Sequence, residues 1–270
     1  MKNLPAEIYG ALGNPIGHSL SPVMHNAAFE AAGVNALYVA FESSDLKGCI
    51  DGMRALGIRG MSITIPFKTS VIPYLDELDP LAERIGAVNT LVNQNGRLKG
   101  YNTDGLGAMK ALQSKVDLAG KRCVLVGAGG AARGIGFMAR ESGMALVVAN
   151  RSVDRGRSLA DYLACPFIPL AQIREIRADV MIQTTPVGMF PRVDASPVPD
   201  DVFRKDMVVM DAIYNPLETH FLRSARAHGC ITISGLEMFL HQGAEQFRLW
   251  TGSNPPMDVM RAVVRNALEK

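Results

Sequence analysis

Val124–Gly134, VLVGAGGAARG, is the stretch that decides the fold, because it predicts a strand, a glycine turn and a helix in immediate succession. The strand is the apolar run Cys123–Val126, and the helix opens at Ala131. A second apolar run, Ala145–Ala149, follows at the spacing that a βαβ unit requires. This context makes the pattern more specific than a lone glycine match, and it predicts a dinucleotide-binding unit.

The turn itself consists of small residues, and each has a physical use. Gly127 permits a tight turn, and Gly129 lets a pyrophosphate approach the backbone. Ala132 is small enough for the helix to pack closely on the strand, so that the helix N-terminus faces the phosphates. The residues of this turn that we expect to contact the cofactor are Gly127, Ala128, Gly129, Gly130 and Ala131.

The end of the second strand indicates which dinucleotide binds. Asp or Glu here would bond a free ribose 2′-hydroxyl, but the chain has Asn150-Arg151-Ser152, with Arg155 close behind. A guanidinium at this point suits a 2′-phosphate, which favours NADP(H) over NAD(H). Asp154 leaves some room for NAD, because its carboxylate could reach a ribose hydroxyl.

Composition bounds the class of protein. The chain has 270 residues, of which 48% are hydrophobic and 20% are charged, as in a globular protein able to bury a core. The net charge of +2 and the scattered Lys and Arg residues argue against a nucleic-acid partner. A groove that attracts phosphorylated or carboxylated small molecules would account for the slight positive excess.

Cysteine usage and the start of the chain favour a cytoplasmic protein. The four cysteines are widely spaced and form no CxxC pair (Cys49, Cys123, Cys165 and Cys230). The opening, MKNLPAEIYGALGNP, lacks the apolar core of a secretory signal, and no apolar run approaches the length of a membrane span. We therefore expect a reducing environment and no membrane partner.

Strand and helix patterns alternate on both sides of the glycine turn. Upstream we expect strands at Ile8–Leu12, Ala36–Phe41 and Gly60–Ile65, helices at 21–33 and Leu46–Ala55, and a hairpin with its tip at Asn95-Gly96. Downstream we expect strands at Val180–Thr184, Val208–Asp211 and Ile231–Ser234, a loop over Pro186–Asp201, and helices at Leu236–Trp250 and Met257–Glu269. The fold class is therefore α/β with two domains.

The mid-chain position of the glycine turn suggests how the domains are divided. We expect a substrate-binding and catalytic domain over residues 1–104 and a Rossmann-type NADP-binding domain over 105–235. The helices of 236–270 are expected to return to the first domain and complete it, with the active site in the cleft between the domains.

Several polar residues stand out, although each also has an ordinary structural explanation. Ser19 and Ser21 suit a turn and a helix N-cap, and Lys68 suits a solvated strand end. Asn89 suits a β-turn, Asp104 a helix cap, and Gln242 an exposed helix face. None of these residues points to a function by itself.

Taken together, the motifs resemble the shikimate dehydrogenase family over essentially the whole chain. The matching segments, in chain order, are GNPIGHSLSP at Gly13–Pro22, SITIPFK at Ser62–Lys68, GAVNTL at Gly86–Leu91, GYNTDG at Gly100–Gly105, the glycine turn with Asn150-Arg151-Ser152, TTPVGM at Thr184–Met189, DAIYNP at Asp211–Pro216, and GLEMFLHQGA at Gly235–Ala244. Eight matches in the correct order make the resemblance highly specific.

The resemblance implies NADPH-dependent, reversible reduction of 3-dehydroshikimate to shikimate in aromatic amino-acid biosynthesis. It places the catalytic lysine at Lys68, with Asp104 as its partner. It implies substrate contacts from Ser19, Ser21, Thr64, Asn89, Tyr214 and Gln242, and cofactor contacts from Thr184, Gly235 and Met238. Hydroxyl groups are chemically reasonable ligands for the substrate carboxylate, because each donates a hydrogen bond without burying another charge.

Two departures from the family pattern leave the substrate preference open. Ser62 stands where the family usually has an Asn that contacts a ring hydroxyl, and Gln183 replaces a common Asn before TTPVGM. The alternatives are therefore a quinate/shikimate or aminoshikimate dehydrogenase, or a shikimate dehydrogenase-like enzyme with low shikimate activity. A non-catalytic NADP-binding regulator is a more distant alternative.

The sequence predicts no metal site and leaves the oligomeric state open between monomer and homodimer. The five histidines do not show ligand spacing (His18, His25, His220, His228 and His241), and hydride transfer needs no metal. The expected partners are small molecules.

Overall fold

The structure, a computed structural model, describes residues 6–269 and divides into two units. Unit 1 comprises Met1–Thr103 with Gly243–Lys270, and unit 2 comprises Asp104–Gln242. The division falls within helix α8 (Gly235–Thr251) rather than at residue 236. Among the described residues, no helix is long and apolar enough to cross a membrane.

Unit 1 contains a mixed six-stranded sheet in the order β2-β1-β3-β5-β6-β4. Its strands are β1 (Glu7–Gly13), β2 (Ala36–Glu42), β3 (Gly60–Ile63), β4 (Glu77–Leu78), β5 (Thr90–Gln94) and β6 (Arg97–Tyr101). Strands β2, β1 and β3 run parallel, whereas β5 pairs antiparallel with both β3 and β6. The carboxyl ends of β1 and β3 therefore lie at one edge of the sheet, together with the start of β5.

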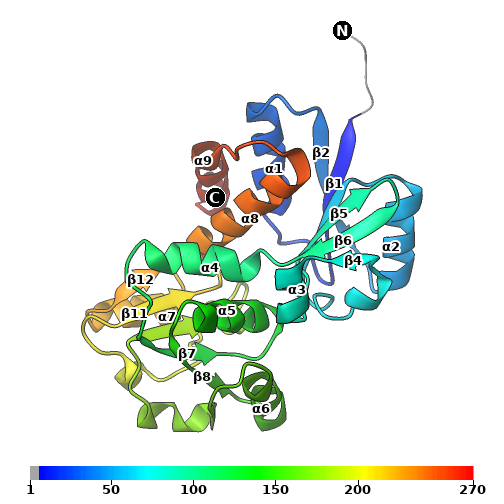
Figure 1. The fold of residues 1–270 in the computed structure, drawn as a ribbon. Helices are drawn as coiled ribbons and strands as arrows, with labels where there is room; N and C mark the ends of the chain where they lie inside the picture. The colour runs from blue at the N-terminus through cyan, green and yellow to red at the C-terminus, as the bar shows by residue number, and fades with distance from the viewer. Residues whose placement is uncertain (1–5, 270) are drawn as a thin grey trace. The chain divides into compact units, whose positions relative to one another are not determined.

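The helices of unit 1 lie on both faces of this sheet (Figure 1). They are α1 (Ser21–Ala31), α2 (Leu46–Ala55), α3 (Pro80–Ile85), the end of α8, and α9 (Met257–Leu268). Ile50 and Met53 of α2 pack into one core cluster with Leu12 and Met61 of the sheet. Helix α1 starts with Leu20 at its N-cap and Ser21 inside the helix, so the N-cap role considered for Ser21 is wrong.

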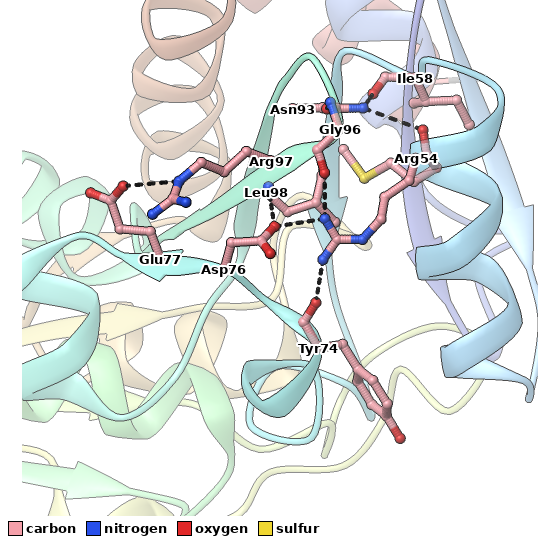
Figure 2. Close-up of polar contacts among 10 residues, drawn as sticks. Arg54, Ile58, Tyr74, Asp76, Glu77, Asn93, Gly96, Arg97 and Leu98 are labelled. Atoms are coloured by element: carbon pink, nitrogen blue, oxygen red, sulfur yellow. Dashed lines mark hydrogen bonds and ion pairs between the residues drawn. The ribbon is translucent and has the colours of Figure 1, made fainter.

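The β5–β6 hairpin is fixed to its surroundings by a polar cluster (Figure 2). Asn95 and Gly96 form its tip with positive φ values of 54° and 91°, which confirms the predicted turn. Buried Asn93 donates to the carbonyl oxygen of Ile58 at 2.9 Å and accepts from the N–H of Gly96 at 2.7 Å. The guanidinium of Arg54 donates to Asp76 at 2.6 Å and to the carbonyl oxygen of Tyr74 at 2.8 Å.

Unit 2 contains a parallel six-stranded sheet in the order β12-β11-β10-β7-β8-β9. Its strands are β7 (Arg122–Val126), β8 (Ala145–Asn150), β9 (Phe167–Pro169), β10 (Val180–Gln183), β11 (Val208–Asp211) and β12 (Ile231–Ile233). This is the strand order of a doubly wound dinucleotide-binding sheet, with its topological switch point between β7 and β10. Ligands bind such sheets at the carboxyl ends of the strands beside that point.

Helices cover both faces of the unit 2 sheet. Helices α4 (Asp104–Gln113), α5 (Gly130–Glu141) and α6 (Val153–Tyr162) share one core cluster with the sheet, and α7 (His220–Ala227) belongs to a second. Short 3-10 helices at Leu170–Glu175 and Asp200–Val202 also pack into the second cluster. The segment 184–199 contains neither helix nor strand, so the predicted loop over Pro186–Asp201 is confirmed except for its last two residues, which begin a 3-10 helix.

Candidate active site

The glycine turn lies between β7 and α5, as the sequence predicts. Gly127 has φ +118°, a value that L side chains rarely adopt, so the turn requires glycine there. Gly129 is the N-cap of α5, and a Cβ added at Gly129 would meet no atom within 4 Å. The backbone at the helix N-terminus is therefore open to a ligand, as a pyrophosphate cradle requires. Ala132 is completely buried against the sheet, which confirms its packing role.

Thr184 lies directly beside this turn at the switch point. Its hydroxyl donates to the carbonyl oxygen of Val126 at 2.7 Å, and its N–H bonds the same oxygen at 2.9 Å. The preceding residue, Gln183, is fully buried, and its amide bonds the backbone of Thr185 and Val187. Gln183 thus shapes the loop after β10 through its side chain, which gives a structural reason for an amide at this position.

The residues expected at the ribose end follow β8, the strand next to β7. Asn150 ends β8, and its side chain donates to the carbonyl oxygen of Ser152 at 2.8 Å. Arg151 and Arg155 are both exposed, the second within the first turn of α6. Two exposed guanidinium groups at this strand end suit a phosphate group better than a neutral hydroxyl.

Four further predicted site residues lie in unit 2. Tyr214 is half-buried and its ring stacks on Phe239, with centroids 4.3 Å apart. Gly235 begins α8, and a Cβ there would lie 2.3 Å from the carbonyl oxygen of Ile213, so only glycine fits. Met238 and Gln242 follow on the same helix, both buried, and the amide of Gln242 donates to the carbonyl oxygen of Phe239 at 3.0 Å. The exposed position considered for Gln242 is therefore wrong.

In unit 1, the loop after β1, which carries Ser19 and leads into Ser21 of α1, lies beside the segment after β3, which carries Thr64. The N–H of Asn14 donates to the carbonyl oxygen of Ile65 at 3.0 Å, which ties the loop after β1 to the segment after β3. The Ser19 hydroxyl accepts from the backbone N–H of Ser21 at 3.3 Å. The Thr64 methyl group packs close to Gly13, where a Cβ would lie only 2.5 Å from it.

The segments that carry Lys68 and Asn89 are joined by a backbone hydrogen bond at the same edge of the sheet. The N–H of Val88 donates to the carbonyl oxygen of Lys68 at 2.7 Å. Lys68 is half-buried rather than a solvated surface lysine. Asn89 is buried and its side chain bonds Thr103, whose next residue in the chain is Asp104. Unit 1 thus places the segments that carry Ser19 and Ser21, Thr64 and Lys68, and Asn89 at one edge of its sheet. Asp104 follows Thr103 directly in the chain.

A buried polar network around Asn89 includes residues that the sequence analysis did not select. It links Asn89 to Thr90, Gln246, Ser62 and Tyr38 through side-chain hydrogen bonds. Gln246 lies one helical turn after Gln242 on α8, and this i, i+4 spacing is a signal that the sequence offers. Ser62 is engaged by Tyr38 and Gln246, so its hydroxyl has defined partners.

Two buried titratable groups have strongly shifted pKa values. Burial lowers the pKa of His25 to about 3, and nearby Gln246 opposes only part of that shift. Burial raises the pKa of Asp211 to about 7, although hydrogen bonds from the Ile213 N–H and the Thr219 hydroxyl lower it in part. Among the described residues, no group of three His, Cys, Asp or Glu side chains could hold a metal ion.

The fold, the dinucleotide-binding turn of unit 2 and the polar residues at the edge of the unit 1 sheet define an oxidoreductase that uses a nicotinamide dinucleotide. The family model of the shikimate dehydrogenase substrate binding domain matches residues 11–91. The family model of the shikimate 5'-dehydrogenase C-terminal domain matches residues 235–265. Shikimate dehydrogenase (NADP(+)) of Moorella thermoacetica is 49% identical over 95% of this chain and 92% of its own. The chain belongs to the shikimate dehydrogenase family.

Solved structures agree with this assignment. Shikimate 5-dehydrogenase of Thermus thermophilus, in complex with NADP(H) and shikimate, has a TM-score of 0.90 at 38% identity, covering 97% of this chain and 100% of that one. Quinate dehydrogenase of Corynebacterium glutamicum, in complex with NAD, has a TM-score of 0.89 at 32% identity, covering 97% of this chain and 99% of that one. The same fold therefore serves two substrates and two cofactors among its relatives.

Proposed function

We propose that this chain catalyses the reversible, NADPH-dependent reduction of 3-dehydroshikimate to shikimate in the cytoplasm, as a step of aromatic amino-acid biosynthesis. The observation that carries the proposal is that the segments bearing Ser19 and Ser21, Thr64 and Lys68, and Asn89 lie at one edge of the unit 1 sheet. Hydroxyl, amide and amine groups gathered there suit a small polyhydroxylated carboxylic acid.

Lys68 has the chemistry required at the reacting carbonyl. Reduction of a ketone places negative charge on its oxygen, so a proton donor must reach that oxygen. An ammonium group can give this proton and take it back in the reverse reaction. The half-buried position of Lys68 in the segment after β3, with its backbone bonded to Val88, supports this role. Asp104 follows Thr103 directly and is proposed to orient the amine.

Other residues of the proposed site bind the substrate. Ser19, Ser21 and Tyr214 are proposed to donate hydrogen bonds to its carboxylate. Thr64, Asn89, Asp104 and Gln242 are proposed to bond its ring hydroxyls. A site that pairs several hydroxyls penalises an analogue that lacks one, because buried polar groups are then left without a partner.

The residues of unit 2 fit NADP(H), which supplies the hydride when bound. The open backbone at Gly129 and the N-terminus of α5 would hold the pyrophosphate. The exposed guanidinium groups of Arg151 and Arg155, beside Asn150 and Ser152, would hold the 2′-phosphate. Thr184, Gly235 and Met238 are proposed to border the nicotinamide end.

Initial rates test the function directly. Purified protein is assayed with shikimate and with quinate, each in the presence of NADP⁺ and of NAD⁺. We expect shikimate with NADP⁺ to give the highest kcat/KM of the four combinations. A higher value with quinate or with NAD⁺ would overturn the proposed preference. Binding of NADPH without turnover of either acid would instead support a non-catalytic regulator.

A shifted ring preference is the second candidate, because Ser62 departs from the family pattern. The Ser62 hydroxyl accepts from Tyr38 at 2.6 Å and donates to Gln246 at 2.9 Å. Its single proton is therefore already used within unit 1. This arrangement favours a site in which another residue supplies the donor for a ring oxygen, and it keeps quinate and aminoshikimate in the substrate panel.

A further inference from the structure

A continuous chain of buried hydrogen bonds runs from Tyr38 to Asn89. The Tyr38 hydroxyl donates to the Ser62 hydroxyl at 2.6 Å, and Ser62 donates to the side-chain Oε1 of Gln246 at 2.9 Å. The amide nitrogen of Gln246 then donates to Thr90 at 2.9 Å, and Thr90 donates to the Asn89 Oδ1 at 2.7 Å. Every residue of the chain is buried, so none of these bonds competes freely with water.

Two backbone groups fix the direction of this chain. The carbonyl oxygen of Asn89 can only accept, and it lies 3.3 Å from the Gln246 amide nitrogen, which must therefore face that side. The N–H of Thr103 can only donate, and it lies 2.8 Å from the Asn89 Oδ1. Thr90 stands between the two amides and can satisfy both only by accepting from Gln246 and donating to Asn89.

We infer that Gln246 is a positioning residue, which acts through Thr90 to fix the orientation of the Asn89 amide. In this orientation the Asn89 oxygen faces Thr90 and the Thr103 N–H, and the amino group is the donor proposed to bond the substrate. The Asn89 Oδ1 has two strong donors, and one amino N–H bonds the Thr103 hydroxyl at 2.9 Å. Because an amide is planar, these contacts set the direction of the second N–H. The inference rests on the proposed substrate role of Asn89.

The fixed orientation of the Asn89 amide has a consequence for the substrate. Asn89 must meet an oxygen that accepts a hydrogen bond, and it discriminates against an analogue in which that hydroxyl is replaced by hydrogen. Without the Gln246 donor, the Thr90 hydroxyl loses one of its two partners, and the Thr103 N–H is the contact that still favours the Asn89 oxygen on this side. The orientation of the Asn89 amide is then less strongly fixed, and part of the discrimination is lost.

Steady-state kinetics of the full chain test the inference. Gln246→Met keeps the approximate length of the side chain without its polar atoms, and Gln246→Glu replaces the amide donor by an acceptor. We expect both variants to raise the KM for shikimate about tenfold, the effect of one lost hydrogen bond, with the KM for NADP⁺ unchanged. We also expect the penalty against one deoxy analogue of shikimate to shrink, whereas analogues lacking the other hydroxyls keep theirs.

Thr90 gives an independent test of the same chain. Thr90→Ser retains the hydroxyl and is expected to keep the wild-type KM, whereas Thr90→Val removes it and is expected to reproduce the Gln246→Met kinetics. In an Asn89→Ala background, Gln246→Met is expected to cause no further rise in KM, because the two residues act through one contact.

Asn93→Leu is the matched control, since it removes another buried amide of unit 1 that lies in the hairpin. It is expected to lower the midpoint of thermal unfolding without changing the KM for shikimate. The inference is wrong if Gln246→Met matches wild type in KM and analogue discrimination, or if its effect adds fully to that of Asn89→Ala. Failure of the proposed function would show differently, as an absence of shikimate turnover by the wild-type chain.

Discussion

At the scale of single residues, position in the sheet changes the interpretation of side chains that are ambiguous in sequence. A lysine just after a strand is usually a solvated charge, but Lys68 is half-buried and its backbone is bonded to Val88. Val88 precedes β5, a strand that pairs antiparallel with β3. The burial of Lys68 therefore depends on a segment distant in sequence, which local patterns do not report.

Lys68 provides the residue-scale prediction. Lys68→Met keeps much of the aliphatic side chain and removes the proton donor. We expect kcat to fall about 10²- to 10⁴-fold, the usual range for loss of a general acid, with a smaller change in the KM for shikimate. The measurement is the initial rate in both directions at saturating substrate.

Lys47→Met is a suitable control, because Lys47 is an exposed lysine of the same unit that pairs with Asp51 on α2. It is expected to leave both constants unchanged. If Lys68→Met retained its turnover and only raised the KM for shikimate, Lys68 would be a binding residue and the assignment as proton donor would be wrong.

At the scale of elements, the hairpin shows how a sequence signal and distant contacts combine. Asn95-Gly96 identifies the turn, but its attachment depends on Arg54 and Asn93, which bond the backbone of other segments (Figure 2). The N–H of Leu98 donates to Asp76 at 2.7 Å, which together with Arg54 lowers the pKa of that carboxyl. The hairpin supplies β5, whose first residue, Thr90, directly follows Asn89.

Asn93→Ala tests the attachment of the hairpin. The variant removes the bonds to the Ile58 carbonyl oxygen and to the Gly96 N–H, and it leaves both groups without that partner. We expect a loss of about 1–3 kcal/mol in the free energy of unfolding, as for a buried hydrogen-bonded group. Urea denaturation measures this loss, and Asn95→Ala, at an exposed tip residue, serves as a comparison within the same hairpin.

Asn93→Ala is expected to lower the free energy of unfolding without changing the steady-state kinetics. The KM for shikimate is expected to stay at its wild-type value in Asn93→Ala at a temperature where the variant is folded. A loss of stability below that of Asn95→Ala would show that the polar cluster contributes little to holding the hairpin.

Long, strongly patterned elements could be predicted from the sequence, and short or long-range features could not. The limits of α2 (Leu46–Ala55) and β11 (Val208–Asp211) agree with the prediction residue for residue. Strands β4 and β9 have only two and three residues and were not predicted, because they carry too little pattern and depend on their partner strands. The role of Gln246 likewise depends on contacts with Thr90 and Ser62, which are far away in the sequence.

At the scale of the whole molecule, the two units carry buried groups whose pKa shifts have opposite effects on stability. His25 of unit 1 is neutral in the folded state and binds a proton on unfolding below pH 6.5. Its contribution to the free energy of unfolding is therefore lost as the pH falls towards 3. Asp211 of unit 2 is protonated in the folded state below about pH 7 and ionises on unfolding, so its contribution is present at low pH and lost as pH rises through 7.

Between pH 6.5 and 4, acidification is therefore expected to destabilise unit 1 through His25 and to stabilise unit 2 through Asp211. Each effect amounts to about 1.4 kcal/mol per pH unit when the group titrates fully on unfolding. The sole tryptophan, Trp250, lies in unit 1 with its ring 5.1 Å from that of His25, so its fluorescence reports that unit. Circular dichroism reports both units, and the two signals should diverge as the pH falls.

Two variants separate these contributions. His25→Phe preserves an aromatic ring against Tyr38, which stacks on His25 at 4.6 Å, but removes the titrating group. Its fluorescence midpoint in urea is expected to vary less between pH 6.5 and 4.5 than that of the wild type. Asp211→Asn mimics the protonated carboxyl, so it should stabilise unit 2 most at pH 8, less at pH 5, and have little effect below about pH 4, where the carboxyl of the unfolded chain is also protonated. A wild-type fluorescence midpoint that stays constant, or moves upward, as the pH falls would contradict the assignment to His25, since acid can only weaken a fold that keeps this imidazole neutral.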